Sequence, residues 1–160
     1  METNSEVIET LNDLILINND RIAGYEKTYD ETKEIESDLR ALFKKFADES
    51  RAIVTDLTQE VIRFGGDPAT GTMLSGKLYR VWMDVRAVFS TDNRMAVLQN
   101  AEAGEDAAQK AYEEALKSET LPADVREMIS NQKISLKGAH DNIKRQRDQQ
   151  RDVSQYPLTT

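Results

Sequence analysis

The chain contains no cysteine, which excludes disulfide bonds, cysteine-ligated zinc sites and cysteine nucleophiles. Helix-breaking residues are also scarce, with three prolines and seven glycines in 160 residues. Most of them lie where helices are expected to stop, because glycine takes the left-handed cap conformation and proline cannot continue a helix. The shortage of breakers favours an all-α protein.

Long hydrophobic runs are missing as well. No stretch of about 18 apolar residues exists that would span a membrane. The first residues, METNSEVIE, are polar and acidic and do not have the pattern of a signal peptide. We therefore expect a cytoplasmic protein with no membrane span.

The charge balance is acidic, with a net charge of -8 and an isoelectric point near 4.8. Phosphates would be repelled, so nucleic acid is not an expected partner. The 39% hydrophobic and 31% charged fractions are typical of a soluble helical bundle. The length fits one domain, which we place at residues 1–150, followed by a C-terminal tail at 151–160.

Apolar residues recur at spacings of three and four along most of the chain, which is the pattern of amphipathic helices. The pattern predicts helices over about 5–32, 37–64, 74–89, 94–118 and 122–148. The segment 74–89 contains the only tryptophan and is interpreted as a shorter helix within a long crossover connection. Two antiparallel helix pairs joined by one long crossover correspond to the ferritin-like four-helix bundle topology.

Each of the four long predicted helices carries one polar residue near the middle of its apolar face: Asn18, Ser50, Glu105 and His140. Residues at equal distances from a turn lie at one level, so these four are expected to form a buried layer. One interpretation is a hydrogen-bonded layer that fixes helix register. The other interpretation is a metal or small-ligand site. Under either interpretation, replacing His140 with alanine is expected to destabilise the fold, because Glu105 would lose its partner in the core.

Six segments of the sequence carry a resemblance to a known family: 11–15, 18–26, 65–68, 76–82, 102–108 and 111–116. They include the repeated Tyr-Glu pairs at 25–26 and 112–113 and the Gly-Gly-Asp-Pro turn at 65–68. The chain resembles the ferritin-like superfamily and, more closely, an uncharacterised bacterial family of four-helix bundles that is a domain of unknown function. The resemblance implies a bundle fold and no agreed activity.

The resemblance to the ferritin-like superfamily also implies a pattern of metal ligands that can be compared with this sequence. A ferritin-like di-iron centre needs one Glu on each of two helices and Glu-x-x-His on each of the other two. Aligned on the Tyr-Glu pairs, this pattern falls on Asn18, Glu105, Ser50 with Ile53, and Lys137 with His140. Only Glu105 and His140 match, which is too few for two iron ions. A mononuclear site for iron or another divalent metal would use these two, with Glu102 or Asp20 as possible extra ligands.

Two functions follow from these patterns, and no catalytic residue is identified. The first is a non-enzymatic bundle that acts by self-association as a homo-oligomer, or by binding a protein partner. Its motivation is an additional apolar face on the first helix, formed by Ile8, Ile15, Leu16 and Ile17. The alternative is a metal-binding or redox protein with a reduced ferritin-like centre; the first function expects no cofactor.

Overall fold

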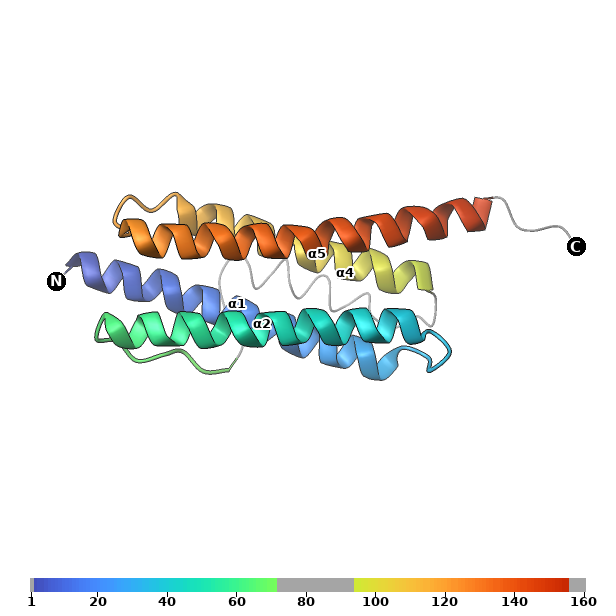
Figure 1. Cartoon of the computed structure of the whole chain (residues 1–160), viewed down its shortest axis with the longest axis horizontal. Helices are drawn as coiled ribbons and strands as arrows, with labels where there is room; N and C mark the ends of the chain where they lie inside the picture. Colours follow the sequence, from blue (N-terminus) through green and yellow to red (C-terminus); the bar gives the residue numbers. More distant parts are fainter. Residues whose placement is uncertain (1, 72–93, 156–160) are drawn as a thin grey trace, which may run out of the picture.

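The computed structural model describes residues 2–71 and 94–155. This part of the chain forms four helices and no strand (Figure 1): α1 (Glu2–Glu31), α2 (Ser37–Arg63), α4 (Arg94–Leu116) and α5 (Ala123–Gln155). The prediction of an all-α, four-helix protein is confirmed. The predicted helix over 74–89 lies outside the described residues. None of the described helices has the length and hydropathy needed to cross a membrane.

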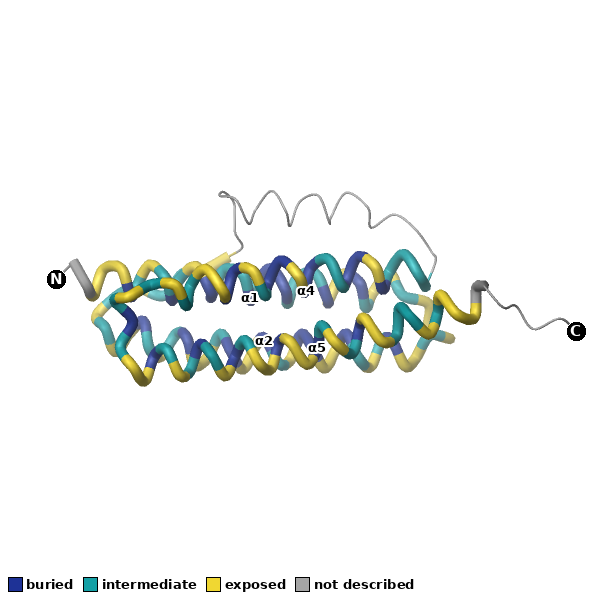
Figure 2. Tube along the Cα trace, turned by 90° about the horizontal axis from the view of Figure 1, so that it is seen from above, coloured by how far each residue is buried: buried dark blue, intermediate teal, exposed yellow. Residues whose placement is uncertain are grey.

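The four helices are arranged as two antiparallel pairs. Short turns join α1 to α2 and α4 to α5, and the pairs lie side by side, with α1 next to α4 and α2 next to α5 (Figures 1 and 2). Every helix therefore contacts two others. The long connection from the end of α2 to the start of α4 joins the pairs.

The end of α2 shows how the sequence sets a helix boundary. Gly65 has a φ of 83° and donates its N–H to Ile62 O, while Gly66 donates to Val61 O, both at 2.9 Å. These two bonds form a Schellman motif, which favours glycine at the left-handed position. A Cβ on Gly66 would lie 2.7 Å from Cγ2 of Ile8. Gly66 thus also allows the end of α2 to approach α1 closely.

Helix α5 is longer than predicted. It continues to Gln155, whereas the sequence pattern indicated an end near 148 and a tail from 151. The added residues are mainly Arg, Gln and Asp, and no glycine or proline interrupts them before Pro157. Arg and Gln have high helix propensity, so the helix persists after its apolar positions have ended.

The core consists of two apolar clusters at different levels of the bundle. One is built around Leu11, Leu57, Tyr112 and Ile129, and the other around Tyr25, Phe43, Leu98 and Ile143. Three of the four residues of the expected additional face of α1 pack into the first cluster, Leu16 being the exception: Ile15 is fully buried, and Ile8 and Ile17 are partly buried against it. These three side chains therefore serve the fold itself and do not form a free interface.

Candidate functional site

A buried ion pair lies between the two apolar clusters. Arg21 on α1 donates from Nε to Oε1 of Glu105 on α4 at 2.8 Å, and the side chains are only 2% and 1% exposed. A buried carboxylate without a counter-charge is strongly unfavourable, so this pair holds α1 to α4.

The guanidinium of Arg21 also contacts α2. Its Nη1 donates to Phe46 O at 3.0 Å and to Ser50 Oγ at 2.7 Å. The rings of Tyr25 and Phe46 lie 5.2 and 5.6 Å from its central carbon, within the range of cation–π attraction. The Tyr25 hydroxyl donates a hydrogen bond to Glu105 Oε1. Hydrogen bonds and aromatic faces therefore replace part of the water that the two charges have lost.

From Ser50 a series of hydrogen bonds continues across the bundle. Ser50 Oγ donates to Asn18 Oδ1 at 2.9 Å, and Asn18 Nδ2 donates to the Tyr112 hydroxyl at 3.0 Å. Tyr112 in turn donates to Gln132 Oε1 on α5 at 2.9 Å. We call the seven residues the polar network: Asn18, Arg21, Tyr25, Ser50, Glu105, Tyr112 and Gln132. It joins all four described helices.

Burial controls the titration of this network. It raises the pKa of the Glu105 carboxyl above its ordinary value, although Arg21 and the hydrogen bond from Tyr25 act in the opposite direction. Burial also raises the pKa of the Tyr25 and Tyr112 hydroxyls, which keeps both phenols protonated and able to donate. Burial lowers the pKa of Arg21, but Glu105, Tyr25 and Glu49 together raise it by more, so the guanidinium stays charged.

Three atoms of the network have no hydrogen-bond partner in the part of the chain that the structure describes: Arg21 Nη2, Glu105 Oε2 and Gln132 Nε2. The first two belong to the ion pair. The third belongs to a side chain that reaches the surface between α2 and α5, because Gln132 is one of the residues lining a groove there.

The structure brings three of the four predicted layer residues together. Asn18, Ser50 and Glu105 are at most 1% exposed and belong to the polar network. His140 does not: it is 18% exposed, and its Nε2 lies 2.7 Å from Asp106 Oδ1. The predicted pairing of Glu105 with His140 is therefore wrong. The buried face of α5 passes through Leu136, Ala139 and Ile143, and His140 lies beside it.

The partner of Glu105 was missed by sequence reasoning. Arg21 is three residues after Asn18 and four before Tyr25, so helical spacing places it on the same face as both. That signal was available. It was not decisive because arginine is almost never fully buried unless it is paired, and the pairing is only visible in three dimensions.

The predicted core metal site does not fit the observed arrangement. Glu105 contacts a permanent cation, Arg21, and its predicted co-ligand His140 points elsewhere. Asp20 is buried on α1 and is not part of the acidic cluster around His140. A divalent ion beside Glu105 would have to displace the guanidinium or accept its repulsion.

A different set of possible ligands surrounds His140. Glu102 and Asp106, one turn apart on α4, and His140 on α5 have ligand atoms within 4.8 Å of one another. The other ring nitrogen of His140 lies 3.1 Å from Asp141 Oδ1. Glu102 also forms an ion pair with Arg147. Of the predicted metal ligands, Glu102 and His140 are thus neighbours, while Glu105 is separate from them.

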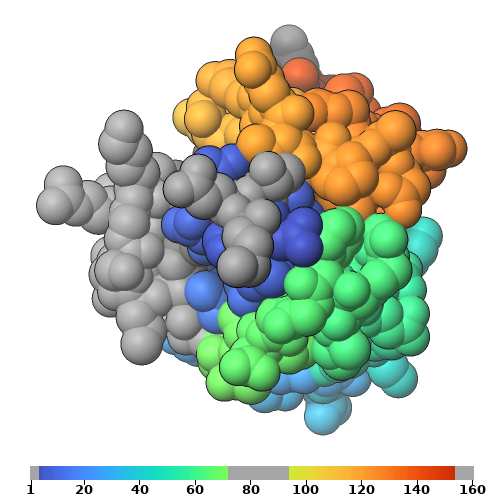
Figure 3. Space-filling model, turned by 90° about the vertical axis from the view of Figure 1, so that its left-hand side faces the viewer, coloured from blue at the N-terminus to red at the C-terminus, as the bar shows by residue number. Residues whose placement is uncertain are grey.

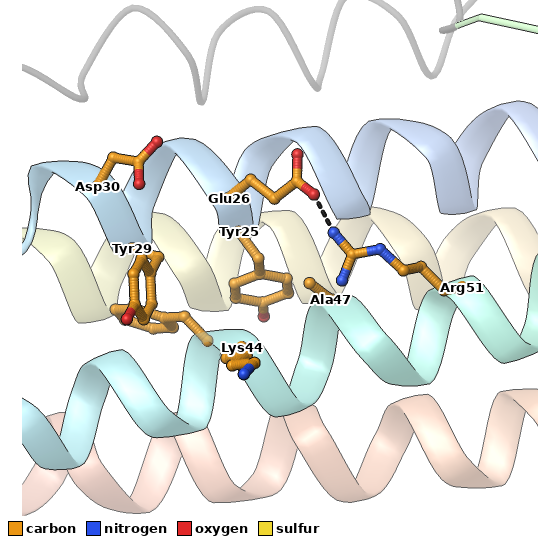
Figure 4. A pocket seen from close by; sticks show the side chains of 8 residues that line it. Tyr25, Glu26, Tyr29, Asp30, Lys44, Ala47 and Arg51 are labelled. Atoms are coloured by element: carbon orange, nitrogen blue, oxygen red, sulfur yellow. Dashed lines mark hydrogen bonds and ion pairs between the residues drawn. The ribbon is translucent and has the colours of Figure 1, made fainter.

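Two surface grooves follow the seams between helices. The groove between α1 and α2 has a volume of about 350 Å³ (Figure 4). Tyr25 and Tyr29 line it, and Glu26 and Arg51 form an ion pair across it. The groove between α2 and α5 has a volume of about 490 Å³. In Figure 3 the end of α2 (green) and the start of α5 (orange) lie next to each other.

Comparison with known proteins identifies a family but no role. No curated protein matches the chain. The profile of one protein family, described as "Domain of unknown function (DUF2383)", matches residues 6–118. This range covers more than half of the chain and includes Asn18, Arg21, Ser50 and Glu105. The chain belongs to this family of domains of unknown function.

Proposed function

We propose that this chain is a non-enzymatic helical bundle that acts by binding protein at its outer surface, and above all by associating with a second copy of itself. The observation that carries the proposal is the polar network. Its buried groups bond mainly to one another and join all four described helices, which is what a structural role requires. The outer surface, which includes the α1–α2 and α2–α5 grooves, is then the part left to act on other molecules.

The network supports a role in fixing one arrangement of the helices. Arg21 bonds simultaneously to Glu105 on α4 and to Ser50 on α2. A shift of any helix by one turn would move its polar residue into an apolar cluster and leave a buried charge or amide without a partner. Buried polar groups that specify register in this way are a known use of such interactions.

The helix arrangement also supports a ferritin-like topology, which we propose for this chain together with the cytoplasmic location expected from its sequence. Two antiparallel pairs are joined by one long connection. In the superfamily pattern Glu105 occupies a metal-ligand position, and here a guanidinium lies against it. We propose that Arg21 provides, within the chain, the positive charge that metal ions provide in di-iron bundles.

Self-association is tested by sedimentation velocity over about a hundred-fold range of protein concentration. We expect the weight-average mass to rise with concentration, from the 18.1 kDa of one chain to at least twice that value. A mass that stays at 18.1 kDa throughout would contradict the proposal.

Metal binding is a second candidate function, favoured by the cluster of Glu102, Asp106 and His140. Two carboxylates and an imidazole are suitable ligands for zinc and similar divalent ions. A carboxylate on the second ring nitrogen, as Asp141 is placed, is the usual arrangement around metal-binding histidines. The site would lie at the surface between α4 and α5 and would differ from a ferritin-like centre in the core.

Isothermal titration with Zn²⁺ checks this candidate. We expect one ion per chain, with binding reduced at least about tenfold in both Asp106→Asn and His140→Ala. Burial lowers the pKa of His140, but Asp141 and Asp106 raise it more strongly, so protons should compete with the metal as the pH falls toward 6. Glu113→Gln, which changes an exposed carboxylate on the same helix, is the matched control. Equal binding by all variants would exclude the site.

A further inference from the structure

The groove between α2 and α5 has a strongly one-sided chemistry. The eight residues that line it include three exposed carboxylates, Asp56, Asp124 and Glu127, and no basic side chain. Ile53 and Met128 contribute an apolar floor. Among the described residues, Asp56 and Glu127 form no ion pair, whereas Asp124 is held by Arg63 at 2.8 Å. The groove therefore favours a partner that is both positively charged and partly apolar.

One buried group at the groove has an unused hydrogen-bond donor. Gln132 is 7% exposed, and its Oε1 accepts the hydrogen bond of Tyr112. Its Nε2 has no partner within residues 2–71 and 94–155. Buried amide groups are normally hydrogen-bonded, so the Nε2 of Gln132 is an exception within the described residues.

The opposite end of α5 carries positive charge, which is complementary to the acidic groove. From Lys144 to Gln155 the helix contains four basic and two acidic residues, in a chain whose net charge is -8. Lys144, Arg145 and Arg151 are exposed and form no ion pair with a described residue. Val153 is 63% exposed. We call this part of α5 the basic tail; its last turns extend past the other described helices in Figures 1 and 2, while Arg147, earlier in it, pairs with Glu102 of α4.

We propose that the α2–α5 groove binds the basic tail of a second copy of the chain, a contact that rests on the self-association proposed above. The tail supplies cations for Asp56 and Glu127 and the apolar side chain of Val153 for the groove floor. The open form of the groove suits an elongated segment.

The geometry of this contact determines the type of assembly. Asp124 lies in the first turn of α5 and the basic tail at its other end, so the groove and the tail are at opposite ends of the molecule (Figure 1). The two surfaces that meet are different, which makes the interface heterologous. Such an interface produces rings when the rotation closes and open chains when it does not.

Charge reversal on each side separates this contact from other modes of association. The groove variant is Asp56→Lys with Glu127→Lys, and the tail variant is Lys144→Glu with Arg145→Glu and Arg151→Glu. Circular dichroism verifies that each is folded. We expect the wild type to associate, and we expect this association to weaken as salt is added. Each variant alone should associate at least about tenfold more weakly, because like charges would then face each other.

An equimolar mixture of the two variants is the decisive measurement. Each groove then meets a tail of opposite sign, so association should return to near the wild-type level. Glu6→Lys with Glu34→Lys is the matched control, since it reverses two exposed acidic residues outside the groove and should associate at least as well as the wild type.

The possible outcomes separate the groove–tail contact from self-association in general. A wild-type chain that stays monomeric overturns self-association and this contact together. A groove variant that associates as strongly as the control overturns the contact alone. Variants that are both monomeric, with a mixture that does not recover, show that the groove does not bind the tail.

Discussion

Replacing Arg21 with alanine is expected to lower the free energy of unfolding by about 3–5 kcal/mol, the usual cost of removing one partner from a buried ion pair. The change would leave Glu105, 1% exposed, with the Tyr25 hydroxyl as its remaining hydrogen-bond donor among the described residues. It would also remove the donors to Phe46 O and Ser50 Oγ. Urea denaturation at neutral pH measures the loss.

Arg51→Ala provides the control for this prediction. Arg51 forms ion pairs with Glu26 and Asp48, but its side chain is 44% exposed. Exposed pairs of this kind contribute about 0–1 kcal/mol. An Arg21→Ala loss no larger than the Arg51→Ala loss would contradict the assignment of Arg21 and Glu105 as a buried structural pair.

The same variant has a defined pH dependence. Without Arg21, the burial that already raises the pKa of Glu105 is no longer opposed by a neighbouring cation. The folded variant then binds a proton at a higher pH than the unfolded chain, whose carboxyl has a pKa near 4.5. Between these two pKa values its stability increases as the pH falls. The deficit relative to wild type should therefore shrink in mild acid, whereas the deficit of Glu105→Gln should not.

Replacing Tyr112 with phenylalanine is the second change for which we expect a large effect, a loss of about 1–3 kcal/mol in the free energy of unfolding. The hydroxyl accepts from Asn18 Nδ2 and donates to Gln132 Oε1, both in buried surroundings. Without it Gln132, whose Nε2 already has no partner among the described residues, would also lose the hydrogen bond that its Oε1 accepts. Thermal or urea unfolding monitored by circular dichroism provides the measurement.

Tyr29→Phe is the matched control for Tyr112→Phe. Tyr29 lies on α1 at the rim of the α1–α2 groove, and its ring faces the guanidinium of Arg40, a contact that phenylalanine keeps. The described residues give its hydroxyl no hydrogen bond. We expect a change within about 0.5 kcal/mol. Similar losses in the two variants would mean that the hydrogen bonds of the Tyr112 hydroxyl add nothing measurable to the free energy of unfolding.

Much of the fold was predictable because its signals are local. Apolar spacing located the four described helices, and Gly65 with Gly66 marked the end of α2. The same spacing placed Asn18, Ser50 and Glu105 on buried faces, where the structure has them. Each of these inferences needs only the geometry of a single helix.

The errors arose where two helices had to be related. Gln132, two turns before His140, is the α5 residue that joins the polar network. His140 follows the buried Ala139 directly, so a rotation of about 100° about the helix axis separates the two side chains. Spacing along one helix cannot determine its rotation against its neighbours. The choice between Glu105 and Asp106 as the partner of His140 depends on that rotation.

Arg21 has one more consequence. A guanidinium is bonded to the polypeptide and keeps its charge throughout the pH range of living cells. The charge of the buried Glu105 carboxylate is consequently balanced as soon as α1 meets α4, by a group that the chain itself supplies. Because this counter-ion is covalently part of the chain, a chelator cannot remove it.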